Sequence, residues 1–592
     1  MRRFLPLLLL ALAGQAGADE GMWTVDNFPS AAVKDRYGAA IDEQWLERVR
    51  LSTVRLEGGC TGSFASPDGL VLTNHHCIRR CITDVSSAEN DVQEKGFFAA
   101  TRDDEVSCPS SQLSVLVAYR EITDEVAEAT AGQAEQAANE IRKQTLTKLE
   151  QACEEAAEKA GTPRSCESVN LYNGGQYFLY EYKRYSDVRL AFAPEGPIAH
   201  FGGDPDNFNF PRWSFDMAFL RAYEDGEPAS TPNFLRWRGE GAAENEAVFV
   251  AGHPGTTNRL LTLTQLKFLR EQTIPNWLLR YSELRGRLLQ FATEGPEQAR
   301  VAKAPLLQIE NAIKVRRNQL FALFNDDVLA QKRAQEQALR DAVAADPDLA
   351  ERYGSAWDEI AEAQEIHRTF YEDWLFAEQG AAFSTELFGY ARNLVRVAAE
   401  REQPNEERLR EYTDAALPRL EQVTKAARPL NTDLETLRLT FSLEKMREWL
   451  GPDHEFVKLV LGGASPESRA QALIGGTSLT DPAARAALWD GGSAAIAASE
   501  DPLIVLARDI GADWAIIDNL HARRAARSQG VQLRGTIGVL LEAASKGQLT
   551  IPEFELLVKE IRNRPEFWSS EQLCDAALER VQTSQPSGTG EP

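Results

Sequence analysis

The stretch GCTGSFASPDGLVLTNHHCIRRC, residues 59–81, contains the features that decide the fold of the first third of the chain. GSFAS and LVLTN have the pattern of two short strands, and the PDG between them is a turn signal, so the stretch predicts a β-hairpin. His75, His76 and Cys77 come directly after the second strand. Two adjacent histidines between an apolar strand and a cysteine raise the question of a catalytic imidazole.

The flanking cysteines favour a catalytic role for His76. A chymotrypsin-like barrel holds its general base in the same order: cysteine, turn, strand, and then histidine directly before a second cysteine. In such a barrel a disulfide ties the entering strand to the residue after the histidine and fixes the imidazole. Cys60 and Cys77 have this relation to His76. An HHC tripeptide alone would be weak evidence, but with the strand, the turn and the cysteine pair it predicts a general base at His76 and a structural neighbour at His75.

A histidine base of this kind needs a carboxylate that orients the imidazole and stabilises the imidazolium. In the chymotrypsin order the histidine precedes the aspartate and the serine comes last. Residues 201–223 offer Asp204, Asp206 and Asp216 in a strand-rich region. Asp204 and Asp206 are flanked by Gly, Pro and Asn, which favours a turn. Asp216 begins an apolar run, where burial beside an imidazole is expected, and we predict it as the partner of His76.

The start of the chain predicts export. Residues 1–18 combine Arg2 and Arg3, an apolar stretch and a small-residue triplet, which is the pattern of a secretory signal peptide cleaved after Ala18. No later window has the apolar length of a transmembrane helix, so we expect a mature protein that is periplasmic or secreted and not held in a membrane. The net charge of -25 argues against binding to nucleic acid, which needs a basic surface.

Six of the seven cysteines lie in the first third of the chain, and Cys574 stands alone near the end. In an oxidising compartment such a set forms disulfides. Proximity favours three pairs, although sequence alone does not determine connectivity: Cys60 with Cys77, Cys81 with Cys108, and Cys153 with Cys166. The alternatives are buried thiols or a zinc site at His76, Cys77 and Cys81, which is less expected outside the cell. We predict no cofactor and no metal.

The predicted secondary structure changes along the chain. Residues 19–265 carry strand patterns such as YFLYEY, DVRLAF, MAFLRAY and AVFVAGHPG, with a helical interruption at residues 122–161. Residues 266–507 have helical patterns. Residues 508–582 are mixed, with ADWAIIDN as a buried strand, and residues 583–592 form a polar tail that we expect to be disordered. The sequence therefore predicts an α+β multidomain protein.

Four motifs carry a family resemblance: GCTGSFASPDGLVLTNHHC, FGGDPDNFNFPRWSFDMAFLRAYEDG, VFVAGHPGTTNR and GTSLTDPAARAALWDGG. In this order, over about residues 20–507, they resemble the secreted bacterial serine dipeptidyl-peptidases, the family that includes dipeptidyl-peptidases 7 and 11. The resemblance implies a chymotrypsin-like double β-barrel with a large inserted α-helical domain. It also implies removal of dipeptides from the free N-terminus of oligopeptides, and it is compatible with a homodimer.

The resemblance assigns roles to individual residues. It implies that His76 is the general base, that Asp216 is its carboxylate and that Asn207 helps to hold the terminal ammonium of the substrate. Phe208 stands where many members of the family have Trp, so an aromatic wall is kept while the substrate preference can differ.

The nucleophile is missing from this pattern. In the family it lies after the helical domain, in a motif of the GNSGSP type whose backbone amides form the oxyanion hole. The nearest candidates here are Ser465, Ser478 and Ser493, none of which is followed by glycine. All three lie in the segment that the resemblance assigns to helices and their loops. The nucleophile therefore stays unknown, and we expect an incomplete barrel.

From about residue 508 the sequence resembles the C-terminal half of a PIN-like protein, in which Asp518 would match one metal-binding acid. One acid does not make a two-metal site, so we predict no nuclease activity. Such a segment would also explain an unpaired Cys574. Two hypotheses remain: a serine dipeptidyl-peptidase, or an inactive truncated or fused remnant that at most binds peptides. Loss of a nucleophile typically slows turnover by about a million-fold.

Overall fold

The computed structural model describes residues 22–510, except 57–58, 88, 134, 201–212, 254–257 and 259, and beyond them only residues 514–516, 532–534, 554 and 558. The expected signal peptide, Asn207, Phe208, Asp518 and Cys574 lie outside the described residues, as does most of the segment from residue 511 onward.

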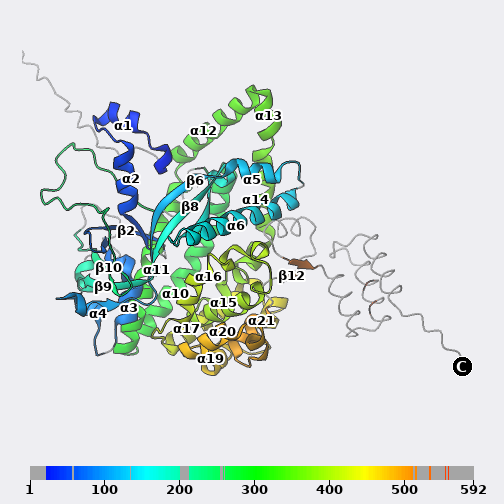
Figure 1. The fold of residues 1–592 in the computed structure, drawn as a ribbon. Coiled ribbons are helices and arrows are strands. Elements are labelled where there is room, and N and C mark those ends of the chain that lie inside the picture. Colours follow the sequence, from blue (N-terminus) through cyan, green and yellow to red (C-terminus); the bar gives the residue numbers. More distant parts are fainter. Residues whose placement is uncertain are drawn as a thin grey trace, which may run out of the picture.

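An antiparallel sheet of eleven strands organises the N-terminal region (Figure 1). Nine strands follow one another in the order β4-β9-β10-β3-β2-β1-β6-β8-β7, while β11 pairs with β10 and β5 with β9. The strands are β1 (Thr53–Leu56), β2 (Cys60–Phe64), β3 (Leu70–Thr73), β4 (Phe97–Phe98), β5 (Val106–Ser107), β6 (Leu113–Glu121), β7 (Ser165–Leu171), β8 (Gln176–Tyr185), β9 (Asp187–Ala193), β10 (Ala218–Glu224) and β11 (Glu227–Pro228).

The predicted hairpin of residues 59–81 is present as β2 and β3. Phe64 pairs with Val71 in the antiparallel register, and both side chains are buried in the core of the sheet. Gly69 closes the turn at a φ of 71°. A Cβ atom at this position would lie 2.6 Å from the carbonyl oxygen of Ala222, so both the backbone angle and the space require glycine.

Seven α-helices surround this sheet or connect its strands. They are α1 (Ser30–Tyr37), α2 (Glu43–Ser52), α3 (Arg79–Val85), α4 (Val92–Lys95), α5 (Thr123–Thr130), α6 (Glu135–Lys159) and α7 (Gly196–Ala199). Helices α5 and α6 correspond to the helical interruption that we predicted at residues 122–161. Helix α6 packs against β7 and β8.

The three predicted disulfides are all formed: Cys60–Cys77, Cys81–Cys108 and Cys153–Cys166. The second lies inside the core of the sheet, where both cysteines are buried. The third joins α6 to β7.

Helices follow from residue 263 to residue 509. They are α9 (Leu263–Phe268), α10 (Ile274–Ala292), α11 (Pro296–Leu323), α12 (Asp326–Ala345), α13 (Pro347–Tyr353), α14 (Ala356–Phe376), α15 (Glu386–Glu400), α16 (Leu417–Lys425), α17 (Thr432–Leu450), α18 (Glu455–Leu461), α19 (Pro466–Gly476), α20 (Pro482–Ala498) and α21 (Pro502–Asp509). In Figure 1 the yellow and orange helices lie together below the strands β6 and β8.

Helix α15 is an example of how the helices of residues 263–509 pack into a core. Thr385 caps its first turn by accepting a hydrogen bond from the backbone N–H of Phe388. Its buried residues recur at helical spacing, as in Leu387, Leu394 and Val397, so one face of the helix is apolar. That face packs in a cluster with α17, α19 and α21.

One expectation differs from the described residues. The AVFVAGHPG segment was expected to be a strand, but its described part, residues 247–253, has no strand assignment. The eleven described strands before residue 263 join one sheet, and the second barrel that the resemblance implies stays a prediction. The expected strand in ADWAIIDN is present as β12 (Trp514–Ile516), which pairs in parallel with β13 (Gln532–Arg534). Within the described part of the chain, no helix is both long and apolar enough to cross a membrane.

Candidate active site

His76 and Asp216 meet at the end of β3. The strand stops at Thr73, and a short 3-10 helix, η2 (His75–Ile78), begins two residues later. The backbone N–H of His76 donates to Oδ1 of Asp216 at 3.0 Å, and Nδ1 of its ring lies 2.7 Å from Oδ2 of the same carboxylate. The side chain of Asn74 donates to the backbone oxygen of Asp216 at 2.8 Å. Three hydrogen bonds thus fix Asp216 against the loop that carries His76.

The sheet brings these two distant residues together. Strand β10 pairs with β3, and Ala218 stands opposite Thr73 in the register. Asp216 stands two residues before the start of β10 and His76 follows β3 after a short turn, so both lie at the same end of the strand pair. The pairing joins groups that are 140 residues apart in the sequence. The structure thus places the two predicted residues in direct contact.

The electrostatics favour an ionised Asp216. Burial alone would raise the pKa of its carboxyl, but the hydrogen bonds from the ring and the backbone of His76 outweigh burial and hold that pKa below its ordinary value of 3.8. Because the carboxylate accepts from Nδ1, this ring nitrogen carries the proton and Nε2 is left as the basic nitrogen. The His76 side chain is 47% exposed, so a reactant can approach it.

His75 has the opposite environment. Its side chain is 3% exposed, and neither ring nitrogen has a hydrogen-bond partner among the described residues. Burial, followed by the charge of His200, lowers the pKa of His75 to about 4. The ring of His200 lies 6.2 Å from that of His75, and its Nε2 is 2.9 Å from a guanidinium nitrogen of Arg79. His75 is therefore a neutral core residue at physiological pH.

Sequence reasoning missed Arg79 and His200. Their contact spans 121 residues and brings together the start of α3 and the residue after α7. No local pattern distinguishes either residue from an ordinary surface cation or a lone histidine. The only signal was that Arg79 closely follows the HHC motif.

The sulfur atoms beside His76 are bonded to each other. The Sγ atoms of Cys60 and Cys77 and a ring nitrogen of His76 lie within 4.8 Å of one another, which could suggest a metal site. The two sulfurs form a disulfide, however, and Cys81 is bonded to Cys108. Since a metal binds thiolates and not disulfides, the bonds remove the zinc alternative that involved Cys77 and Cys81.

The three serines considered as nucleophiles have other partners. Ser465 caps α19 by accepting from the N–H of Ser468. Ser478 donates to a carboxylate oxygen of Asp501 at 2.9 Å. Ser493 donates to the backbone oxygen of Ala398. None of these hydrogen bonds involves His76, so the serine nucleophile stays unassigned among the described residues.

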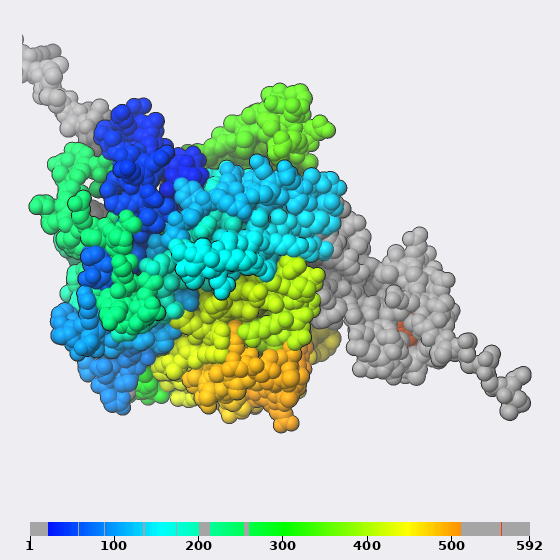
Figure 2. All heavy atoms as spheres, viewed as in Figure 1, coloured from blue at the N-terminus to red at the C-terminus, as the bar shows by residue number. Residues whose placement is uncertain are grey.

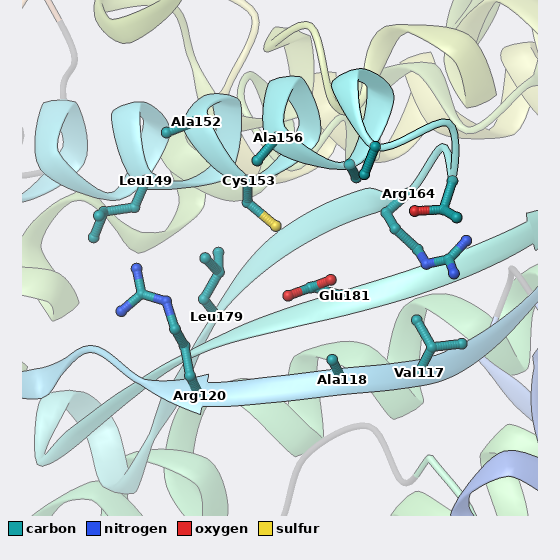
Figure 3. A pocket seen from close by; sticks show the side chains of 13 residues that line it. Val117, Ala118, Arg120, Leu149, Ala152, Cys153, Ala156, Arg164, Leu179 and Glu181 are labelled. Carbon is teal, nitrogen blue, oxygen red and sulfur yellow. The ribbon is translucent and has the colours of Figure 1, made fainter.

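A cavity of about 530 Å³ lies elsewhere, between α6 and the strands β6 and β8 (Figure 3). Leu149, Cys153 and Ala156 point into it from the helix, and Glu181 lies on its opposite wall. His76 and Asp216 are not among its lining residues. The pair of His76 and Asp216 thus belongs to a different part of the surface.

The sequence pattern of one protein family, peptidase S46, matches residues 18–552. The chain belongs to the peptidase S46 family. An Asp/Glu-specific dipeptidyl-peptidase of Shewanella putrefaciens is 28% identical over 86% of this S46 chain and 70% of that relative. A dipeptidyl-peptidase 7 of Phocaeicola vulgatus is 34% identical over 45% of the chain and 40% of the relative.

A solved structure has a similar fold. The crystal structure of Porphyromonas endodontalis DPP11 in complex with the dipeptide Arg-Glu superposes with a TM-score of 0.63 at 18% sequence identity. The superposition covers 86% of this chain and 75% of that one. The S46 match extends past residue 507 and thus includes part of the segment that we compared with a PIN-like protein. The PIN-like comparison stays a prediction.

Proposed function

We propose that this S46 chain provides the general base and its carboxylate for a serine dipeptidyl-peptidase, which removes dipeptides from the free N-terminus of oligopeptides. The observation that carries the proposal is the 2.7 Å contact between Nδ1 of His76 and Asp216. In a serine peptidase this pair activates the nucleophile. The proposal includes a chymotrypsin-like arrangement of two barrels, of which the described sheet would contribute the half that bears His76.

The reaction follows from the free Nε2 of His76. Nε2 accepts the proton of the serine hydroxyl while the serine oxygen bonds to the scissile carbonyl carbon. The imidazolium then returns this proton to the amine as the C–N bond breaks, which leaves an acyl-enzyme. Water repeats the sequence and releases the dipeptide. Asp216 stabilises the imidazolium in both steps.

The relatives support the substrate class. They are named dipeptidyl-peptidases, and the Porphyromonas endodontalis structure holds a dipeptide. We propose that the amide oxygen of Asn207 accepts from the terminal ammonium of the substrate and that Phe208 forms an apolar wall beside it. The three disulfides support a proposal that the protein works outside the cytoplasm, in the periplasm or as a secreted enzyme.

The second candidate function is an inactive peptide-binding protein. The observation in its favour is that Ser465, Ser478 and Ser493 all hydrogen-bond within the helical region. The comparisons favour the peptidase, because the relatives named above are dipeptidyl-peptidases.

Calorimetric titration of the full chain with a tripeptide tests recognition of the N-terminus, and the same tripeptide with an acetylated N-terminus is the matched control. We expect acetylation to weaken binding by about tenfold or more, because it removes a charged donor from the site. Equal affinity for both peptides would contradict the proposed function.

A fluorophosphonate probe, which reacts with an activated serine, tests for the nucleophile. We expect no labelled serine in this chain on its own, and labelling would reveal the nucleophile and refute the inactive alternative.

A further inference from the structure

The loop of His76 and the chain that leads to Asp216 are joined at a second point, by Arg79 and His200. A guanidinium nitrogen of Arg79 lies 2.9 Å from Nε2 of His200. Arg79 begins α3 shortly after His76, and His200 directly follows α7. Helix α4, the next after α3, packs against α7, and in Figure 2 the blue atoms of this region border the green atoms of β9 and β10. We call the contact between Arg79 and His200 the clasp.

The chemistry of the two groups fixes the direction of the hydrogen bond in the clasp. A guanidinium has donors only, so Arg79 donates and Nε2 of His200 accepts. That nitrogen therefore carries no proton, and the imidazole of His200 is neutral in the clasp. The buried ring of His75 packs edge to face against that of His200 at 6.2 Å. Because a hydrogen bond is stronger where water is excluded, the clasp holds its partners more firmly than an exposed contact would.

The segments 198–200 and 214–216 are bonded to each other. The hydroxyl of Ser214 donates to the backbone oxygen of Ala199 at 2.8 Å. The backbone N–H of Phe215 donates to a carbonyl oxygen of α7 at 3.0 Å. One segment ends with the histidine of the clasp and the other with the aspartate that contacts the imidazole. A displacement of the first segment is therefore passed on to the aspartate.

Together with the contact between His76 and Asp216, these bonds close a ring. One side of the ring is the short stretch of chain from His76 to Arg79, and the other runs from His200 through the two bonded segments to Asp216. The carboxylate is thus held against the imidazole loop at two points. The charges agree with this arrangement: burial lowers the pKa of Arg79, and the nearby carboxylate of Asp216 opposes that effect.

We propose that Arg79 and His200 are positioning residues, whose hydrogen bond holds Asp216 where its carboxylate fixes Nδ1 of His76. The inference rests on the proposed function, in which this carboxylate orients a general base. Both residues act through Asp216.

Nuclear magnetic resonance of the full chain with 15N-labelled histidine tests the clasp and requires no turnover. The measured quantity is the rate at which the Nδ1 proton of His76 exchanges with water. The chain has seven histidines, and the spectrum of His76→Gln assigns the signal. His200→Leu removes the acceptor of the clasp, whereas His200→Gln keeps an oxygen acceptor. We expect exchange about tenfold faster in His200→Leu, and within about twofold of the wild type in His200→Gln.

Arg79→Met removes the donor from the other side of the clasp and should speed the exchange by a similar factor. Its combination with His200→Leu should add no further acceleration, because both changes break the same contact. Arg102→Met is the control: Arg102 pairs with Asp68 at 3.0 Å, and both side chains are 55% exposed. This variant should leave the exchange unchanged. Circular dichroism verifies folding, and if Arg79→Met does not fold, the two His200 variants decide the question alone.

Unchanged exchange in His200→Leu would overturn the inference. Equal acceleration in His200→Leu and His200→Gln would also overturn it, because the shape of the side chain and not its acceptor would then matter. Faster exchange in Arg102→Met would show that the effect is not specific to the clasp and would overturn it as well. The proposed function fails separately: if the chain binds the free and the acetylated tripeptide equally while the exchange still depends on the acceptor at position 200, the clasp stands and the function is refuted.

Discussion

His75 and His76 differ in their surroundings although they are adjacent in the sequence. His76 is half exposed and its ring is held by Asp216, whereas His75 points into the core and its ring has no hydrogen-bond partner among the described residues. Only a histidine that solvent and reactants reach, with one nitrogen fixed by a carboxylate, can act as a general base. The burial of His75 agrees with the structural role that we predicted for it.

The buried ring of His75 predicts a loss of stability in acid. Its pKa of about 4 lies below the ordinary value of 6.5, so between these values the unfolded chain binds a proton that the folded chain does not. The free energy of unfolding therefore falls as the pH drops from 6.5 towards 4. For this shift we expect a loss of about 2 kcal/mol between about pH 7.5 and about pH 5, measured by urea unfolding. The variant His75→Leu should not show this loss. At neutral pH its free energy of unfolding should equal or exceed that of the wild type, because neither ring nitrogen has a hydrogen-bond partner among the described residues.

Ile78→Val is the control for this prediction. Ile78 lies in the same short helix as His75, is also 3% exposed and carries no titratable group. This variant should lose about 1 kcal/mol of stability at every pH and keep the full acid dependence of the wild type. If His75→Leu loses as much stability as the wild type between the two pH values, the assignment of the acid dependence to His75 is wrong.

The contact between His76 and Asp216 could be predicted, but its surroundings could not. His76 and Asp216 stand in local patterns: a strand, a turn and a cysteine for one, and the start of an apolar run for the other. Arg79 and His200 become neighbours only through tertiary packing, which no local pattern encodes. The nucleophile was sought by its motif, and the three serines nearest to that motif have partners in the helical region.

Among the elements, strands with a neighbour on the sheet were predictable and the unpaired segment was not. YFLYEY and DVRLAF lie in β8 and β9, which pair with other strands along their lengths. AVFVA is also rich in β-branched and aromatic residues and was expected to be a strand, but no described strand pairs with it. Strand propensity expresses how well side chains fit a pleated surface, and a strand also requires a partner for its backbone.

The Cys60–Cys77 disulfide connects the start of β2 to the loop that carries His76. It closes a separation of 17 residues, so replacing both cysteines by alanine should lower the free energy of unfolding by about 3 kcal/mol. We also expect the amide of His76 to exchange its hydrogen faster, because its hydrogen bond to Asp216 depends on the position of this loop. Urea unfolding and hydrogen exchange with mass spectrometry measure the two effects.

The Cys153–Cys166 pair provides a matched control, because it closes a separation of 13 residues between α6 and β7. Its alanine variant should lose a similar amount of stability, about 3 kcal/mol, and leave the exchange at His76 unchanged. Unchanged exchange at His76 after loss of the Cys60–Cys77 bond would show that Asp216 alone holds the loop.

At the scale of the whole molecule, the sheet and the helical region are joined by polar contacts. Arg428, which lies between α16 and α17, donates through Nε to Oδ1 of Asp84 on α3 at 2.7 Å, and it also contacts Glu386 on α15. The Asp84 side chain is fully buried and that of Arg428 is 8% exposed. Burial alone would lower the pKa of Arg428, but Glu386 and Asp84 outweigh it and raise that pKa, so the guanidinium stays charged.

Arg428→Met should weaken the junction between the two regions. The substitution leaves the carboxylate of Asp84 buried without its main cationic partner, which we expect to cost about 3 kcal/mol. Because the lost contact bridges the sheet and the helices, calorimetry should show one unfolding transition for the wild type and two for the variant.

Lys303→Met is the control across the same junction. Lys303 pairs with Glu94 at 2.5 Å, but both side chains are exposed, 37% and 54%. That variant should lose less than about 1 kcal/mol and keep a single transition. Two transitions in the wild type would show that Arg428 does not couple the two regions.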